Sequence, residues 1–348
     1  MLRSDARGPA FELSDERHHA VEFPSAGVSA HRSQRSHPLS LLRRGVRAQG
    51  VKRRVLWRLL DGRAGHAAQS LGLARALERR LPLDVIDIPV TRRWRPALDG
   101  FAGRWPPGEG LPAPDLLIGA GQSAQINLLA ARHAFGGRAV LLMRPVLPVG
   151  WFDLCLIPQH DHPPSRSNVI VTRGMLNPAR PAAVRDPGLG LILLGGPGRH
   201  FGWDEGRVLD QLRALVARRP GRDWRLVVSR RTPARMCRAV TKIPGLRLAE
   251  NGLRGDALYR LMGRAGEIHV SEDSLSMIWE ALTAGAPTGL IGLRRPARPT
   301  RLTRAVDALL AEGLVAAPGT AGRPPAPPGL DEAGRCADWI RDRWLKED

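Results

Sequence analysis

Short apolar runs alternate with longer amphipathic segments along the first half of the chain. The apolar runs predict buried strands, and they are RRVLWRLL (53–60), LDVIDIPV (83–90), DLLIGAG (115–121), RAVLLM (138–143), FDLCLIP (152–158) and NVIVT (168–172). Leucine and alanine at helical spacing predict helices over 66–80 and 122–135. Strands that are apolar throughout are buried on both faces, so this half predicts a parallel sheet covered by helices on both sides.

A second series of the same kind follows a segment rich in proline, glycine and alanine, 173–190. Its predicted strands are LILLGG (191–196), WRLVVS (224–229), LRLAE (246–250), EIHV (267–270) and TGLIGL (288–293). Its predicted helices are 204–219, 232–242, 256–265 and the run that begins near Ser274. The chain therefore predicts an α/β fold of two Rossmann-like domains whose parallel sheets face a cleft.

Composition shifts along the chain predict the domain boundaries. Residues 1–50 are polar and without period, which predicts a disordered extension. We expect a first domain over 51–175, a linker over 176–188 and a second domain over 189–348 that ends in a helix after a proline-rich loop.

The chain of 348 residues is 43% hydrophobic and has a formal net charge of +20. Such a charge predicts a polyanionic partner: a phosphorylated ligand, an anionic membrane surface or nucleic acid. Nucleic acid is disfavoured because the sequence contains no nucleic-acid-binding module. An odd number of widely spaced cysteines, Cys155, Cys237 and Cys336, excludes a disulfide framework and favours a reducing cytoplasm. No apolar run is long enough for a membrane span.

Polar loops after the first and third predicted strands are the candidate acceptor side. DGRAGHAAQS places Asp61, Gly65 and His66 at the start of a helix, and Gln122 and Ser123 begin the next one. Ligands of open parallel sheets bind at the carboxyl ends of the strands, where a histidine can accept a proton near neutral pH. His66 is therefore the candidate catalytic residue; the alternative is a capping histidine that packs locally.

Three loops of the second half are the candidate donor side. In GGPGRHFGWD, Gly196 and Gly198 would let backbone amides approach a phosphate, although a plain surface turn is the alternative. In SRRTP, Thr232 suits a helix N-cap, and Arg230 beside Arg231 would grip a diphosphate.

The third donor loop is SEDSLSMIWEALTAGAP, 271–287. Asp273 or Ser274 is a plausible N-cap, and Ser276 shares one helix face with Glu280, whose carboxylate would suit the two hydroxyls of a ribose. The sequence contains neither a metal-ligand cluster nor an Asp-x-Asp motif, so we expect no metal and no cofactor.

The stretch TRRWRPALDGFAGRWPPG, 91–108, mixes arginine with aromatic rings. Such a mixture is typical of a membrane-interface patch, in which rings reach headgroup depth and guanidinium groups meet lipid phosphates. The predicted patch consists of Arg92, Arg93, Trp94, Arg95 and Trp105. A solvated loop whose tryptophans pack back onto the sheet is the alternative.

Six motifs in combination carry a family resemblance, namely DGRAGHAAQSLGLARAL, GAGQSAQINLLA, TRGMLNP, GGPGRHFGWD, SRRTP and SEDSLSMIWEALTAGAP. Together they resemble the bacterial branch of the ELM-type mitochondrial-fission family, whose bacterial members are described as GT-B glycosyltransferases. The chain is more distantly similar to the lipid-linked N-acetylglucosaminyltransferase of peptidoglycan synthesis, whose Gly-His pair matches Gly65-His66. That enzyme and lipid-A disaccharide synthase carry an acid seven residues before a proline, as Glu280 stands before Pro287.

The resemblance implies a cytoplasmic GT-B enzyme, peripheral on the inner membrane, that moves a sugar from a nucleotide-diphosphate donor to a cell-envelope or lipid-linked acceptor. The alternative is a non-catalytic adaptor of the same shape that acts in membrane remodelling, as the plant relative's name suggests. The departure from the enzymes is the acid-rich SEDS, 271–274, where they carry small residues and glycine.

Overall fold

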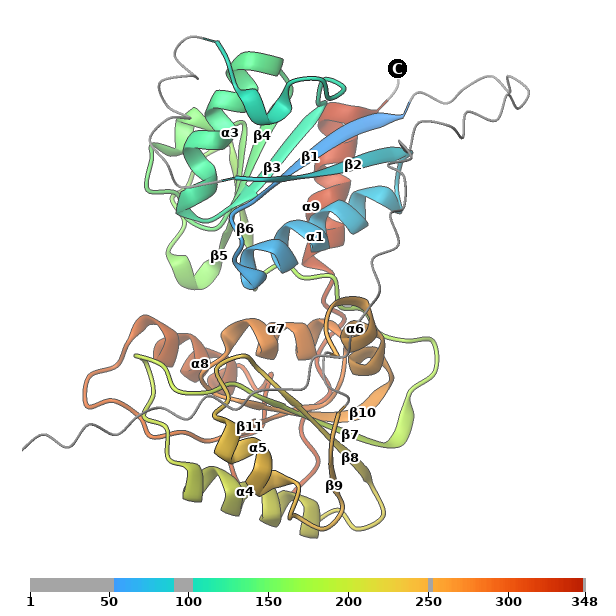
Figure 1. Cartoon of the computed structure of the whole chain (residues 1–348), viewed down its shortest axis with the longest axis vertical. Helices are drawn as coiled ribbons and strands as arrows, with labels where there is room; N and C mark the ends of the chain where they lie inside the picture. Colours follow the sequence, from blue (N-terminus) through green and yellow to red (C-terminus); the bar gives the residue numbers. More distant parts are fainter. Residues whose placement is uncertain (1–52, 91–102, 250–252, 347–348) are drawn as a thin grey trace, which may run out of the picture. The chain divides into compact units, whose positions relative to one another are not determined.

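The computed structural model describes residues 53–90, 103–249 and 253–346, which form two parallel sheets with covering helices (Figure 1). The first sheet consists of β1 (Arg54–Leu60), β2 (Leu83–Pro89), β3 (Leu116–Ala120), β4 (Arg138–Leu142), β5 (Leu154–Pro158) and β6 (Val169–Thr172). The second consists of β7 (Asp186–Leu194), β8 (Asp223–Val228), β9 (Leu246–Leu248), β10 (Ala265–Ser271) and β11 (Thr288–Ile291). The predicted fold of two Rossmann-like halves is confirmed.

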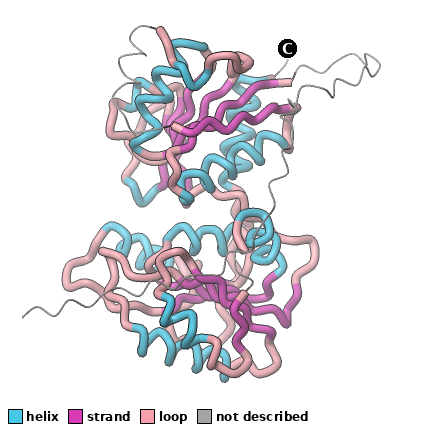
Figure 2. The backbone as a smooth tube through the Cα atoms, in the orientation of Figure 1, coloured by secondary structure: helices cyan, strands magenta, loops and turns pink. Residues whose placement is uncertain are grey.

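The first sheet has the strand order β2-β1-β3-β4-β5-β6, and every pair is parallel. Two separate hydrophobic clusters lie on its two faces, as the apolar strands require. The helices of this half are α1 (Ala64–Glu78), α3 (Gln122–Phe135) and α9 (Glu332–Ile340), together with short turns at Pro106–Gly108, Val149–Trp151 and Gln159–Asp161. Figure 2 shows these helices around the strands. Cys155 is buried in β5, where burial raises the pKa of its thiol to about 12.

The C-terminal helix α9 belongs to the core of the first sheet, although the predicted second domain ran to residue 348. Cys336, Ala337 and Ile340 are buried in one cluster with residues of β1 and α1. Arg80, two residues after the end of α1, also forms a bidentate salt bridge with the carboxylate of Asp338, at 2.7 and 2.8 Å. Figure 1 shows α9 beside α1. The residue spacing in α9 predicts an apolar face, but it does not show which sheet that face covers. The sequence-based prediction therefore assigned the helix to the second domain.

Trp105, which we predicted in a membrane patch, is a core residue, so that part of the prediction was wrong. Its side chain is 1% exposed and stacks on Trp57 with ring centroids 5.9 Å apart, and its indole N–H donates to Asn127. Burial of an indole with its N–H bonded stabilises the half more than exposure at a surface would. Arg92, Arg93, Trp94 and Arg95 lie outside the described residues.

The predicted linker over 176–188 is buried at its start, 176–179, and largely exposed from 180 to 188. Leu176 and Ala179 are buried, and the amide of Asn177 donates to the carbonyl of Trp279 and to the hydroxyl of Thr283. Strand β7 already begins at Asp186, within the predicted linker. The segment therefore connects the two halves through a packed first part and a largely exposed second part.

The second sheet has the order β11-β10-β7-β8-β9, again all parallel. Its helices are α4 (Glu205–Ala217), α5 (Ala234–Val240), α6 (Gly255–Arg264), α7 (Leu275–Thr283) and α8 (Arg301–Ala311). Chain order reverses beside the first strand of each sheet, between β1 and β3 and between β7 and β10. Loops that leave such a switch point diverge and open a crevice at the carboxyl ends of the strands, which is where open α/β sheets bind ligands.

Candidate functional site

A histidine-carboxylate pair occupies the switch point of the first sheet. Asp61 follows β1, and its carboxylate Oδ2 lies 2.8 Å from Nδ1 of His66 in the first turn of α1. The Asp61 side chain is 3% exposed and the His66 side chain 16% exposed. A carboxylate can only accept a hydrogen bond, so Nδ1 carries the proton of the neutral ring and Nε2 is its acceptor atom. This arrangement can hold a base in a fixed tautomer.

Gly121, the N-cap of α3, fixes the other side of this histidine. Its φ is +74°, and a Cβ at this position would lie 2.1 Å from Cε1 of His66. Any larger residue would therefore strain the turn and displace the imidazole. The predicted acceptor-side residues follow the same loops: Gly65 lies beside His66, and Gln122 and Ser123 open α3. A Cβ at Gly65 would lie 3.9 Å from the Ser276 hydroxyl of α7.

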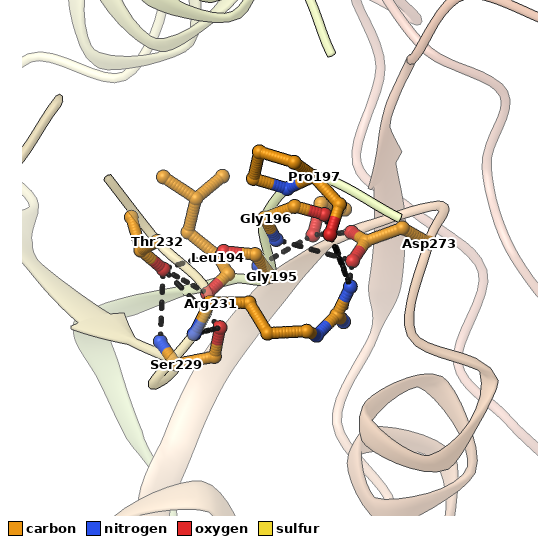
Figure 3. Close-up of polar contacts among 9 residues, drawn as sticks. Leu194, Gly195, Gly196, Pro197, Ser229, Arg231, Thr232 and Asp273 are labelled. Atoms are coloured by element: carbon orange, nitrogen blue, oxygen red, sulfur yellow. Dashed lines mark hydrogen bonds and ion pairs between the residues drawn. The ribbon is translucent and has the colours of Figure 1, made fainter. Parts of the chain in front are cut away.

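Polar groups converge at the switch point of the second sheet (Figure 3). The carboxylate of Asp273 accepts hydrogen bonds from the amide of Gly196 at 3.1 Å and from the hydroxyl of Ser271 at 2.6 Å, and it pairs with Arg231 at 2.6 Å. The amide of Gly195 donates to Ser271 at 2.8 Å. The glycine loop is therefore tied to the end of β10 by side chains of the SEDS segment.

The β8–α5 loop brings Arg231, rather than Arg230, to this point. Arg231 donates to the carbonyl of Gly196 at 3.0 Å and lines the adjacent cavity, whereas Arg230 is exposed and does not line it. A Cβ at Gly196 would lie 2.2 Å from the Arg231 carbonyl oxygen, so this glycine permits close packing of two loops. Thr232 is not the N-cap that the sequence predicted, because the N-cap of α5 is Pro233. Its hydroxyl, which has one proton to donate, lies within hydrogen-bond distance of the carbonyls of Leu194 and Gly195, and it accepts from the backbone amide of Ser229. Gly198 lies beside the Arg231 guanidinium.

Helix α7 begins at the edge of the same cavity. Ser274 is its N-cap but makes no side-chain capping bond, and Ser276 in the first turn donates weakly to the sulfur of Met175. Glu280 lies one turn further, 9% exposed, where Tyr259 of α6 hydrogen-bonds its carboxyl group. Burial raises the pKa of Glu280 to about 7. Glu280 is outside the residues that line the cavity, whereas both serines are among them.

The cavity at these loops has a volume of about 530 Å³. It is lined by Met143, Pro158, His160, Asp161, Met175, Arg199, His200, Arg231, Asp273, Ser274, Leu275, Ser276, Arg301 and Leu302. Sequence reasoning missed Arg301, the first residue of α8, and His160 and Asp161 after β5. Asp161 is buried and pairs with Arg301 and, at 3.3 Å, with His160. For His160 and Asp161, the sequence signal was their position, because QHDH, 159–162, directly follows the carboxyl end of a predicted strand.

Burial of the His160 imidazole lowers its pKa, an effect that the carboxylate of Asp161 partly opposes. His160 therefore favours its neutral form more than a solvent-exposed histidine does. Three arginines, Arg199, Arg231 and Arg301, line the cavity together with Asp161 and Asp273, which leaves an excess of one positive charge when the histidines are neutral. Such a lining suits a ligand that carries phosphate.

Within the described ranges, no group of three or more histidine, cysteine, aspartate or glutamate side chains is placed to hold a metal ion. In that same part of the chain, none of the helices combines the length and the apolar character that crossing a membrane needs.

The fold and the site define a class of protein: one with two Rossmann-like domains and with polar groups at the switch point of each sheet. The model of the mitochondrial fission ELM1 family matches residues 64–344, so the chain belongs to this family. The resemblance inferred from the six motifs is confirmed. No curated protein matches the chain by sequence.

Solved structures of similar fold include S. aureus MnaA with UDP, at 14% identity and a TM-score of 0.44, with 83% of this chain and 96% of that chain covered. Another is MurG from Acinetobacter baumannii, at 14% identity and a TM-score of 0.45, with 76% and 85% covered. Likeness of this degree carries no inference about substrate or activity.

Proposed function

We propose that the protein is a glycosyltransferase that moves a sugar from a nucleoside-diphosphate donor to a hydroxyl acceptor. The observation that carries this proposal is the Asp61–His66 pair at the first switch point, 2.8 Å apart with the carboxylate buried. A histidine held in one tautomer by a buried carboxylate serves proton abstraction. The position of the pair at the carboxyl edge of the sheet is where open α/β sheets bind ligands.

The proposed reaction uses the free Nε2 atom of His66. As an acceptor hydroxyl attacks the anomeric carbon, its proton passes to Nε2, and the imidazolium is stabilised by Asp61. The bond from oxygen to the anomeric carbon forms while the bond from that carbon to the diphosphate breaks. The nucleoside diphosphate leaves with the electron pair, and the charge that develops on it needs positive groups nearby.

Those positive groups lie on the second half of the protein. Arg231 and Arg301 line the cavity, together with the first turn of α7, where Ser274 and Ser276 stand. Backbone amides in the first turn of a helix have no partner within the helix and favour an anion. In this proposal they hold the leaving diphosphate without a metal ion. The ribose role predicted for Glu280 is not carried over, because its buried carboxyl group lies outside the cavity lining.

The acceptor that we propose is a cell-envelope or lipid-linked molecule, met by a protein that acts in the cytoplasm and touches the inner membrane peripherally. This part rests on the net charge of +20 and on the family resemblance. With Trp105 buried, the proposed membrane patch consists of Arg92, Arg93, Trp94 and Arg95. Vesicle co-sedimentation tests it: binding to anionic but not neutral vesicles, lost at high salt, is the expected result.

A non-catalytic adaptor is the second candidate, and one observation favours it. The glycine-loop amides and the Arg231 guanidinium already have partners in Ser271 and Asp273, so part of the expected phosphate site is filled by the protein itself. A protein that no longer binds a donor would tolerate such a filled site.

Turnover separates the two candidates. Parent protein and His66→Ala would be incubated with UDP-, ADP-, GDP- and dTDP-sugars, and release of nucleoside diphosphate would be followed with and without envelope lipid extract. We expect release by the parent and a loss of about 10²–10⁴-fold in the variant, the usual contribution of a general base. Release by neither protein, with folding verified by circular dichroism, favours the adaptor.

A further inference from the structure

The carboxylate of Asp273 occupies the position in the second half where a phosphate would bind. It lies at the switch point between β7 and β10, within hydrogen-bond distance of the Gly196 amide and of the Arg231 guanidinium (Figure 3). A glycine loop after the first strand of a Rossmann-like sheet is where phosphates meet backbone amides. In this protein the anion at that place is a side chain of the chain itself.

The ion pair between Asp273 and Arg231 is held by the surrounding fold and is not a contact between two mobile surface side chains. The side chain of Asp273 is 4% exposed, and three donors surround it: Gly196 N and an Arg231 terminal nitrogen from two other loops, and Ser271 Oγ at the end of β10. The close approach is required at Gly195 as well, because a Cβ there would lie 2.1 Å from the Asp273 carboxylate. Arg231 remains 45% exposed and lines the cavity.

We propose that Asp273 is an internal competitor for the phosphate of the ligand, so that Arg231 and the Gly196 amide pass from Asp273 to the ligand when it binds. The inference rests on the proposed function and deepens it by naming the residue that sets the affinity of the phosphate site. Two anions cannot share one guanidinium and one amide without mutual repulsion, so each ligand must displace the carboxylate. Apparent affinity is then reduced by the fraction of molecules in which the site is closed.

The arrangement also selects among ligands. A ligand with two phosphates can replace the carboxylate with more charge and more acceptor atoms than a neutral ligand has, so only a strongly anionic ligand can open the site. An uncharged nucleoside does not compete with Asp273 and gains nothing from its removal. Asp273 is therefore a specificity-determining residue of this cavity.

The neighbouring acid, Glu272, supplies a matched control. Its carboxylate accepts from the amide of Leu293 at 2.8 Å and pairs with Arg295 at 2.6 Å, and neither of these partners lines the cavity. Glu272→Gln removes the same unit of charge one residue away and leaves the phosphate site unchanged. Any gain that comes from the general increase in positive charge will appear in both variants.

The test is calorimetric titration of inorganic pyrophosphate, of nucleoside diphosphates and of uridine into the parent, Asp273→Asn and Glu272→Gln. We expect Asp273→Asn to bind pyrophosphate and diphosphates at least about tenfold more tightly, the scale of one lost charge-assisted bond. Uridine affinity should not change, and Glu272→Gln should match the parent. In an Arg231→Gln background, Asp273→Asn should give a smaller gain than in the parent, because only the Gly196 amide of the two contested donors is left.

Two results overturn the proposal. Unchanged or weaker pyrophosphate binding by Asp273→Asn would mean that the carboxylate holds Arg231 in place for the ligand, and an equal gain in Glu272→Gln would mean general electrostatics. Asp273→Ser, which keeps a hydroxyl beside the Gly196 amide, repeats the measurement if the asparagine variant does not fold. A gain for pyrophosphate with no nucleotide bound by any variant would support the competitor and reject the proposed donor.

Discussion

Nδ1 of His66 and Oδ2 of Asp61 lie 2.8 Å apart at the carboxyl edge of the first sheet, and the aspartate is the more buried of the two. The carboxylate holds the imidazole with its acceptor nitrogen free. Asp61→Asn keeps the shape but presents an amide that can donate, which favours the wrong tautomer.

We therefore expect Asp61→Asn to lower turnover by about 10²–10⁴-fold, close to the effect of His66→Ala. The double variant should lose little beyond either single one, because residues that act as a unit are not additive. Donor affinity, measured separately, should stay near that of the parent. Additive losses, or a change confined to donor affinity, would contradict a shared catalytic role.

The two adjacent arginines of the β8–α5 loop provide a matched comparison. Arg231→Gln should weaken nucleoside-diphosphate binding by about tenfold or more, because it removes a charge-assisted hydrogen bond. Arg230→Gln removes the same charge from an exposed position and should have a much smaller effect. Titration of both variants with the same diphosphate decides the matter, and equal losses would show that only net charge counts.

Glu280 predicts a pH dependence of stability. Its pKa rises from 4.5 to about 7 on burial, so the folded protein holds a proton between these values that the unfolded chain has released. The stabilising contribution of Glu280 is therefore greatest below pH 4.5 and falls by about 3 kcal/mol as the pH rises to about 7. Denaturant unfolding should show this fall in the parent and not in Glu280→Gln.

The exposed Glu109 is the control for that measurement, because its side chain is 58% exposed. Glu109→Gln should keep the fall in unfolding free energy that the parent shows. If Glu280→Gln follows the parent at every pH, the buried carboxyl group is not protonated in the folded state.

The placement of α9 predicts that the last helix stabilises the first half. Ile340 is fully buried among residues of that half, so Ile340→Ala should lower the free energy of unfolding by about 2–5 kcal/mol. The exposed Ile126 is a control, and Ile126→Ala should change it by less than about 1 kcal/mol. Similar effects of the two substitutions would contradict the packing of α9.

The strands and helices were predictable because the sequence signal for each of them is local. The run LCLIP within FDLCLIP has no polar position, and such a run must be covered on both faces. The Asp61–Gly65–His66 loop was likewise predictable, since a loop after an apolar strand lies at the carboxyl edge. The sequence also predicted the β8–α5 loop at this edge, although Arg231 rather than Arg230 lines the cavity.

What the sequence did not reveal depends on contacts between distant segments. Trp105 and Arg104 are adjacent in an arginine-rich stretch, and only the stack on Trp57 shows that the indole is buried. Arg230 and Arg231 are equivalent in sequence, and the direction of the loop decides which one meets Asp273. Arg231 lies 42 residues from Asp273, so no local pattern could show that the carboxylate pairs with this guanidinium.

Titration of nucleoside diphosphates into the parent protein tests most directly the proposal that the protein binds a nucleoside-diphosphate donor. UDP, ADP, GDP and dTDP would each be compared with the matching nucleoside by calorimetry, at fixed salt and with folding verified. We expect at least one diphosphate to bind. Its nucleoside should bind at least about tenfold more weakly, because it lacks the phosphates that contact the arginines. Binding of none of the four, by the parent and by Asp273→Asn alike, would contradict the proposal.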